Sequence, residues 1–294
     1  MNRTGLTHIL PLIPLFAVVS TVLTGCVFVS PHQELLENSH KEKIGICKDE
    51  TAQFSRYYMD ANHQLDPENI SVLNWNIHKN KGENWIEDFN SLSKGKDIII
   101  IQEAYLDDEL RNALAQQDRF WSLNAAFYLF EKPAGVLMAS TFKPYYSCGY
   151  RVLEPIIRLP KSVLFHYYKM KGCQQTLLVA DIHGINFTLG IRAYRRQIEM
   201  LEKIAAQHKG PMIVAGDFNN WNDERKAIVN QMQSALSLKS GKIKKTHQTH
   251  FFGKVIDYIF YRGLVPVFST SKMVTSSDHN PIQIQFRLAT AKES

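Results

Sequence analysis

The sequence lacks several features that would restrict its class. It contains no long block of acidic or basic residues, no low-complexity tract and no internal repeat. With 45% hydrophobic and 21% charged residues, its composition excludes an intrinsically disordered protein. Its 294 residues are enough to bury a large core in one or two domains.

Cysteine is also scarce. The four cysteines include no C-x-x-C pair, so the spacing of a common zinc site is missing. Beyond the N-terminal region, Cys47, Cys148 and Cys173 remain, and two of them can form one disulfide if the chain is exported. Three pairings are possible, and sequence spacing does not choose among them.

The excess of positive charge is modest. The net charge is +6 and the isoelectric point is about 9.0. A basic surface suits a polyanionic partner such as nucleic acid, or an anionic membrane. Because many soluble proteins are mildly basic without such a partner, the charge gives only weak support to either interpretation.

The N-terminus begins with an apolar run over residues 9–23, and Arg3 is the only charged residue before position 34. This run is too short and too rich in proline for a typical membrane span. Leu23-Thr24-Gly25-Cys26 ends it and resembles a bacterial lipobox, where a peptidase cleaves before a cysteine that carries a diacylglycerol.

The lipobox resemblance implies a lipoprotein signal peptide over residues 1–25, export, and membrane anchoring through a lipid on Cys26. Val27 stands where an aspartate would favour the inner membrane, so the outer membrane facing the periplasm is expected. The alternatives are a plain anchor in the cytoplasmic membrane, or a cleaved signal followed by an incidental cysteine.

From residue 71 onward the chain alternates apolar strands with amphipathic helices, whereas residues 26–70 are polar and weakly patterned. We therefore expect a tether over residues 26–70 and one α/β domain over residues 71–290. Four consecutive isoleucines at residues 98–101 are typical of a strand buried on both faces. The predicted strands are residues 71–77, 97–102, 135–140, 144–153, 162–170, 175–181, 211–215, 255–261, 266–270 and 282–286, and the predicted helices are residues 85–92, 108–117, 191–204 and 223–236.

Polar side chains lie at or near the ends of these apolar strands, where sheet enzymes assemble their sites on a rigid scaffold. Each motif has an ordinary explanation, because Gly-Asp-x-Asn is a common turn and a histidine after a strand is usually structural. The ordered set is more specific than any single member. It consists of Asn76, Glu103, His183, Asp217, Asn219, Asp257, Asp278 and His279.

These groups match what phosphodiester hydrolysis requires. A hard divalent cation relieves negative charge on phosphorus, and the oxygens of Glu103 and Asn76 are suitable ligands. His279 can act as the base, oriented by the carboxylate of Asp257. The remaining members can position water or phosphate, or donate to the leaving group.

The order of these motifs resembles the DNase I-like superfamily of endonucleases, exonucleases and phosphatases, which includes apurinic endonucleases, DNase I, sphingomyelinases and inositol polyphosphate phosphatases. The resemblance covers about residues 71–288 and implies a four-layer α/β sandwich, with two mixed β-sheets flanked by helices. It also implies Mg²⁺ or Mn²⁺ as cofactor. By this resemblance Asn76, Glu103 and Asp278 serve the metal site, His183, Asp217 and Asn219 contact the phosphate or the metal, and Asp257 and His279 form the catalytic dyad.

Residues 154–162, 183–190, 260–264 and 277–281 give a closer resemblance to the YafD-like bacterial group, which suggests a family label but no substrate. The first stretch contains Arg158 and Lys161, which can hold a substrate anion or lie in a solvated loop. Tyr105 is a departure, because DNase I carries an arginine at that position, and it weakens a DNase I-like interpretation.

The leading expectation is metal-dependent phosphodiester hydrolysis, with nucleic acid as the first candidate substrate. The first alternative is hydrolysis of phospholipid head groups or of another phosphorylated small molecule, although no hydrophobic hairpin for membrane insertion is evident. The second is a catalytically inactive surface binding protein. Such a protein would have lost Glu103, Asp217 or His279, and all three are present. No obligate protein partner is predicted.

Overall fold

The computed structural model describes residues 27–38, 47, 64–243, 247–290 and 292–293. The expected signal peptide at residues 1–25 and the lipidation site Cys26 lie outside the described residues. Within the described ranges, every helix is too short or too polar to cross a membrane.

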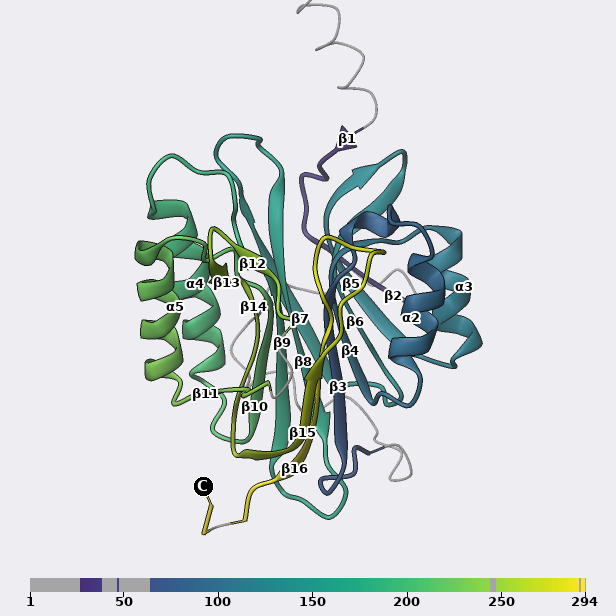
Figure 1. Cartoon of the computed structure of the whole chain (residues 1–294), viewed down its shortest axis with the longest axis vertical. Coiled ribbons are helices and arrows are strands. Elements are labelled where there is room, and N and C mark those ends of the chain that lie inside the picture. The colour runs from purple at the N-terminus through teal and green to yellow at the C-terminus, as the bar shows by residue number, and fades with distance from the viewer. Residues whose placement is uncertain (1–26, 39–46, 48–63, 244–246, 291, 294) are drawn as a thin grey trace, which may run out of the picture.

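Two mixed β-sheets form the centre of the fold (Figure 1). The larger sheet has eight strands in the order β1-β5-β6-β4-β3-β16-β15, with β2 also paired to β5. β3 and β4 run parallel to each other. The strands are β1 (Val27–Phe28), β2 (Glu34–Glu37), β3 (Ile70–Asn76), β4 (Ile98–Tyr105), β5 (Phe120–Leu129), β6 (Lys132–Ser140), β15 (Leu264–Ser271) and β16 (Ile282–Leu288).

The smaller sheet has six strands in the order β11-β14-β10-β9-β8-β7, with β9 and β10 parallel. A separate two-stranded ribbon pairs β12 (His250–Phe251) with β13 (Lys254–Val255). The strands of the smaller sheet are β7 (Tyr146–Leu153), β8 (Pro160–Lys169), β9 (Thr176–His183), β10 (Met212–Asp217), β11 (Lys239–Ser240) and β14 (Asp257–Arg262).

Helices cover the outer face of each sheet (Figure 1). α2 (Trp85–Ser93) and α3 (Asp108–Gln116) pack on the larger sheet, whereas α4 (Arg192–Ala205) and α5 (Asp223–Ala235) pack on the smaller one. Side-chain caps fix two helix starts, because Asp107 accepts from the Leu110 amide at 2.9 Å and Asn222 accepts from the Arg225 amide at 2.8 Å. The expected four-layer α/β sandwich is therefore confirmed.

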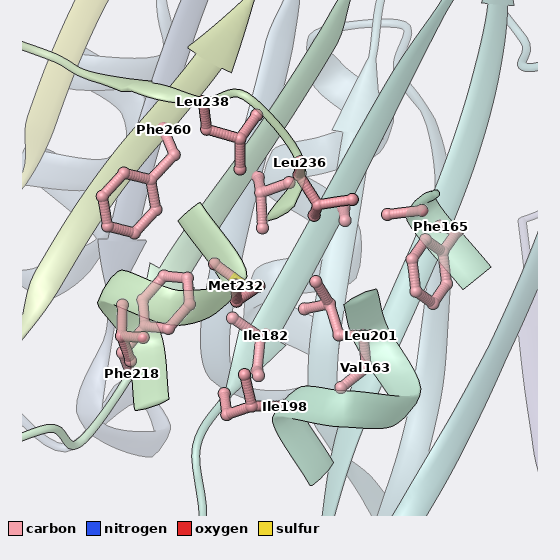
Figure 2. Close-up of a cluster of buried hydrophobic side chains, with 14 of the residues drawn as sticks. Val163, Phe165, Ile182, Ile198, Leu201, Phe218, Met232, Leu236, Leu238 and Phe260 are labelled. Atoms are coloured by element: carbon pink, nitrogen blue, oxygen red, sulfur yellow. The ribbon is translucent and has the colours of Figure 1, made fainter. Parts of the chain in front are cut away.

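Alternation along the strands fills three hydrophobic layers. In β4, Ile98 and Ile100 face the core between the sheets, while Ile99 and Ile101 pack beneath α2 and α3. All four are buried, as the isoleucine run predicted. The third layer lies between the smaller sheet and its helices (Figure 2), and includes Val163, Phe165, Ile182, Ile198, Leu201, Phe218, Met232, Leu236 and Phe260.

Three strands of the larger sheet were not predicted. β5 contains Ser122 and Asn124, so it lacks the apolar run of a buried strand, yet both side chains are fully buried. The Nδ2 of Asn124 donates to the Tyr150 and Val163 carbonyls of the other sheet, at 3.0 and 2.8 Å, which satisfies its N–H groups there. β1 and β2 fall within the expected tether, and Leu35 of β2 is completely buried.

A disulfide joins Cys47 to Cys148 on β7, 101 residues apart in the sequence. Cys173 is a free thiol and is partly buried. The structure thus selects one of the three pairings that the sequence left open.

The strand directions bring several ends to one edge of the sandwich. β3 and β4 end there in the larger sheet, and β9 and β10 end there in the smaller sheet. β14 begins at this edge, because it pairs antiparallel to β10 with Asp257 opposite Asp217. We call it the site edge, and the residues that the sequence set apart are gathered along it.

Candidate active site

Glu103 reaches the site through an irregularity in β4. The sequence placed it just after a strand, but β4 continues to Tyr105. The register with β6 shifts between Ile101 and Ala104, and Glu103 itself has φ +52°. Such a bulge redirects a side chain, and a positive φ is costly for a non-glycine residue. The backbone thus aims the Glu103 carboxylate into the pocket that it lines.

Two glycines let the ends of β9 and β10 approach closely. Gly216 has φ +143°, and a Cβ there would lie 2.0 Å from the Ile182 carbonyl oxygen. A Cβ on Gly184 would lie 2.4 Å from the Phe218 carbonyl oxygen. Any side chain at either position would therefore push His183 and Asp217 apart.

Asp257 and His279 form the expected dyad. The two carboxylate oxygens of Asp257 lie 2.8 and 3.1 Å from Nδ1 of His279. Asp257 is 2% exposed, so the imidazole compensates a carboxylate that water hardly reaches. The Trp75 indole donates to the His279 carbonyl at 2.9 Å, which fixes the loop that carries the histidine.

Asp217 lies at the centre of the polar cluster. Its Oδ1 accepts from the Asn219 amide at 2.9 Å, and its Oδ2 accepts from the side-chain amides of Asn219 and Asn76 at 3.1 and 3.2 Å. The same Oδ2 lies 3.6 Å from His183 Nε2 and 3.9 Å from His279 Nε2. The structure therefore brings four other predicted residues together around the one buried carboxylate of Asp217.

Glu103 lies on the other side of His183 and faces cations. Its Oε1 is 3.6 Å from His183 Nε2, and its Oε2 accepts a hydrogen bond from the Lys79 ammonium. Lys161 lies 2.8 Å from the same imidazole nitrogen. Lys79 was missed by the sequence analysis, because it sits in the short helix η2 (His78–Asn80) with φ +57° and follows no periodic pattern.

These charges shift the ionisation of the carboxylate and the imidazole. Burial opposes ionisation of Glu103, yet the imidazole of His183 and the ammonium groups of Lys79 and Lys161 outweigh it and lower the pKa of Glu103 to about 2. Burial, with the charge of Lys161, holds the pKa of His183 well below 6.5. His183 is therefore neutral at pH 7, and the lysines are the cations that face Glu103.

On the side of the pocket that holds the Asp257–His279 dyad, the pKa values of Asp217 and His279 are raised and not lowered. Burial and the nearby Asp257 carboxylate raise the pKa of Asp217 to about 7. Burial alone would lower the pKa of His279, but Asp257 and Asp217 raise it to about 10. His279 consequently carries a proton at pH 7 in this arrangement.

The other two predicted site residues lie further out. Asp278 lines the pocket, but its side chain is 60% exposed and its Oδ1 lies 3.6 Å from His78 Nδ1. Arg158 is exposed in the β7–β8 loop and does not line the pocket, whereas Lys161 does. Of the two candidate anion-binding cations, the structure therefore places only Lys161 at the site.

The pocket has a volume of about 420 Å³ and joins these groups to an apolar wall. The wall includes Phe127, Ile157, Leu159, Phe187 and Phe251. None of these apolar residues was predicted, because they come from loops and strand ends that are far apart in the sequence. The pocket therefore combines a charged floor with apolar sides.

Two buried charged residues hold the loop between β9 and α4 at the pocket. Glu154 is completely buried and accepts hydrogen bonds from the amides of Asn186, at 2.6 Å, and Phe187. Arg225 donates to the carbonyls of Ile185, Asn186 and Asn219 at 2.7–2.8 Å. Its guanidinium lies between the rings of Tyr194 and Trp221, 4.6 and 4.5 Å from their centroids.

The donor set fits a divalent cation. Carboxylate and amide oxygens of Glu103, Asp217, Asn76 and Asn219 are hard ligands of the type that Mg²⁺ and Mn²⁺ prefer. Among the described residues, ligand atoms of Asp217, Asp257 and His279 also lie within 4.8 Å of one another. The ammonium of Lys79 contacts Glu103 as a cation would.

Comparison with known proteins identifies the class. Residues 72–279 match the Endonuclease/Exonuclease/phosphatase family, and the chain belongs to this family. It is 37% identical over 222 residues to a UPF0294 protein of Vibrio campbellii, covering 74% of this chain and 78% of the relative. A UPF0294 protein of Vibrio vulnificus is 36% identical over 238 residues, covering 80% and 84%. These relatives confirm the YafD-like resemblance.

Solved structures share the fold at low sequence identity. The catalytic domain of human Nocturnin with bound sulfate has a TM-score of 0.60 and 20% identity, over 77% of this chain and 96% of that domain. ANGEL2, a 2′,3′-cyclic phosphatase, has a TM-score of 0.56 and 16% identity, over 76% and 96%. Members of the superfamily are hydrolases of phosphoesters and generally use a divalent metal.

Proposed function

We propose that this protein hydrolyses phosphodiester bonds with Mg²⁺ or Mn²⁺ as cofactor. The observation that carries the proposal is the buried Asp257–His279 pair, 2.8 Å apart, in one pocket with a Glu103 carboxylate that faces cations. The pocket thereby offers a proton-handling group and a cation-binding group on opposite sides of a space that admits a phosphate. Convergence of these residues counts against an inactive binding protein.

Each residue of the chain has a defined part in this proposal. Glu103 and Asn76, with Asp278 at the pocket edge, would hold the cation, which when bound relieves negative charge on the phosphoryl group. His183 and Lys161 would contact the phosphoryl oxygens, because they lie 2.8 Å apart at the pocket floor. Asp217 and Asn219 would orient the attacking water.

His279 exchanges a proton with the reacting oxygens, and Asp257 stabilises the imidazolium. As described, the histidine is charged at pH 7. Additional positive charge near Asp217 would lower the pKa of His279 and free its Nε2 to accept a proton. A role for His279 as base therefore requires a cation in the pocket.

Nucleic acid remains the first candidate substrate in this proposal, supported by the net charge of +6. One structural neighbour, ANGEL2, is a 2′,3′-cyclic phosphatase, which also points to nucleotide esters as substrates to test. A phospholipid is the second candidate, and the apolar side chains around the pocket favour it. The phosphoester chemistry is common to both.

A panel assay tests the chemistry. The full chain is incubated with plasmid DNA, RNA, sphingomyelin, phosphoinositides and bis-p-nitrophenyl phosphate, in Mg²⁺, Mn²⁺ or EDTA. We expect turnover only with metal, and loss of turnover in Glu103→Gln at an unchanged unfolding temperature. Glu224→Gln, on the exposed surface of α5, is the matched control and should keep activity. Full activity in EDTA would contradict the proposal.

We further propose that the protein is exported and anchored through a lipid on Cys26. The support is the lipobox-like Leu23-Thr24-Gly25-Cys26 and the disulfide between Cys47 and Cys148, which suits an oxidising compartment. Cys26→Ser should leave an unlipidated precursor in the cell. Wild-type protein found in the cytosol at full precursor mass would refute the anchor.

A further inference from the structure

Exposed apolar side chains are concentrated at the site edge. Among the described residues, twelve large apolar side chains are exposed, and only Val267 and Phe268, both on β15, lie away from this edge. Three of the others, Ile157, Phe187 and Phe251, line the pocket, and Ile156, Leu189 and Phe252 lie beside them on the same loops. We call these six residues the apolar rim.

The exposure of the rim is large for side chains of this type. Leu189 is 88% exposed and Phe252 is 76% exposed. An apolar group gathered on one face of a soluble domain marks a surface that another molecule covers. Phe251 and Phe252 lie at the turn of the β12–β13 ribbon, a short hairpin that the sequence did not reveal.

The rim is held in place. Glu154 fixes the backbone amide of Phe187 from its buried position under the loop. The ring of Phe252 lies 4.5 Å from that of Phe251 and 5.9 Å from that of Trp221. Since these contacts tie Phe187 to Glu154 and Phe252 to Trp221, the apolar surface is part of the folded domain.

Positive charge lies beside the apolar surface. A groove of about 670 Å³ separates the β7–β8 loop from the β9–α4 loop. Its walls include Leu153 and Leu189, and it also contains Arg192 and Arg196, both exposed. Apolar side chains for the interface, with arginines for phosphate groups, match the surface of an anionic phospholipid bilayer.

The chain enters the domain at the same edge. β1 starts at Val27 and pairs with Tyr128 and Leu129, at the end of β5 that lies along the site edge (Figure 1). The sequence immediately before β1 contains the apolar run at residues 9–23. An anchor in that region would therefore hold the rim toward the membrane.

We infer that the apolar rim is a membrane-docking surface, which seats the mouth of the pocket on the head groups of an anionic phospholipid bilayer. The inference rests in part on the proposed membrane anchor and not on the proposed chemistry. Docking in this orientation gives the pocket direct access to phosphodiesters in the bilayer.

Trp221 provides a natural probe of this surface. It is partly exposed beside Phe252, whereas Trp75, Trp85 and Trp121 are each at most 5% exposed. The full chain is reconstituted into vesicles of phosphatidylethanolamine and phosphatidylglycerol, with lipids brominated near the head-group end of their acyl chains. We expect quenching of tryptophan emission that Trp221→Phe removes.

Two double variants distinguish the effect of the apolar rim from the effect of exposed apolar side chains elsewhere on the domain. Phe252→Ser with Leu189→Ser should reduce the quenching by about threefold or more, because it removes apolar area from the bilayer contact. Val267→Ser with Phe268→Ser removes two exposed apolar side chains elsewhere and should leave the quenching unchanged. Thermal unfolding of each variant, and the single variant Leu189→Ser, check that folding is intact.

Several results would overturn the inference. One is wild-type quenching no greater than that of Trp221→Phe, and another is equal loss in the two double variants. Shielding of Trp221 by an oligonucleotide, without quenching by brominated lipid, would assign the rim to nucleic acid instead. None of these measurements uses turnover, so a failed activity assay and a failed docking test remain distinguishable.

Discussion

The dyad allows a quantitative prediction. The pKa of His279 rises from 6.5 to about 10 through Asp257 and Asp217, which corresponds to about 5 kcal/mol in favour of the imidazolium at about 1.4 kcal/mol per pH unit. Asp257 is the closer carboxylate, at 2.8 Å, so we assign it about half. Asp257→Asn should therefore lower kcat about 10²-fold if the imidazolium forms in the transition state. His279→Ala should lower it by at least about 10²-fold.

The double variant tests whether the pair acts as one unit. If the two residues act independently, the double variant should lower kcat by about 10⁴-fold. If they act as one unit, it should lower kcat little more than His279→Ala alone does. The assay is kcat on bis-p-nitrophenyl phosphate at saturating Mg²⁺, with circular dichroism as the folding control. Multiplicative losses in a well-folded protein, or a loss below about tenfold in His279→Ala, would refute the reasoning.

Two further predictions concern stability. Burial lowers the pKa of His166 to about 3, so the unfolded chain binds the extra proton and stability should fall by up to about 1.4 kcal/mol per pH unit as pH drops from about 6.5 toward 3. The free energy of unfolding of His166→Gln, measured in urea across this pH range, should depend less steeply on pH than that of the wild type. An unchanged slope would contradict the lowered pKa of His166. Arg225→Lys replaces a planar fork that donates from two nitrogens with one ammonium on a single nitrogen and removes the flat contact with Tyr194 and Trp221, so it should cost about 2–4 kcal/mol. Arg196→Lys, at an exposed position, is the control. Equal unfolding midpoints for the two variants would argue against a role for Arg225 in holding the loop between β9 and α4.

The residue pattern predicted the α/β class and the Asp257–His279 pair for a physical reason, whereas the four-layer arrangement was implied by the resemblance to the DNase I-like superfamily. Buried parallel strands are nearly continuous apolar runs, so a polar residue at their end stands out. Asn76, His183 and Asp217 were found in this way, and the parallel pairs β3–β4 and β9–β10 bring them to one edge. Asp257 was found because a carboxylate inside an apolar strand needs a partner, and the structure supplies His279.

The parts that the sequence missed depend on backbone geometry or on distant contacts. The bulge at Glu103 and the turn carrying Lys79 both use positive φ at non-glycine residues, which no residue pattern marks. β5 escaped prediction because the side-chain N–H groups of its buried Asn124 find their partners only in carbonyls of the other sheet. Phe251 lies in a two-residue strand, too short for a period to show.

Strand β1 has a consequence for how far the domain can reach. A free tether over residues 26–70 would let the domain range up to about 150 Å from its anchor, at about 3.4 Å per extended residue. Instead, Val27 already pairs with Leu129, and Leu36 of β2 with Leu123. If Cys26 holds the lipid, almost no slack remains between bilayer and sheet. The protein would then work as a surface-bound enzyme whose substrates must come to the membrane, with rates set by their density in that plane.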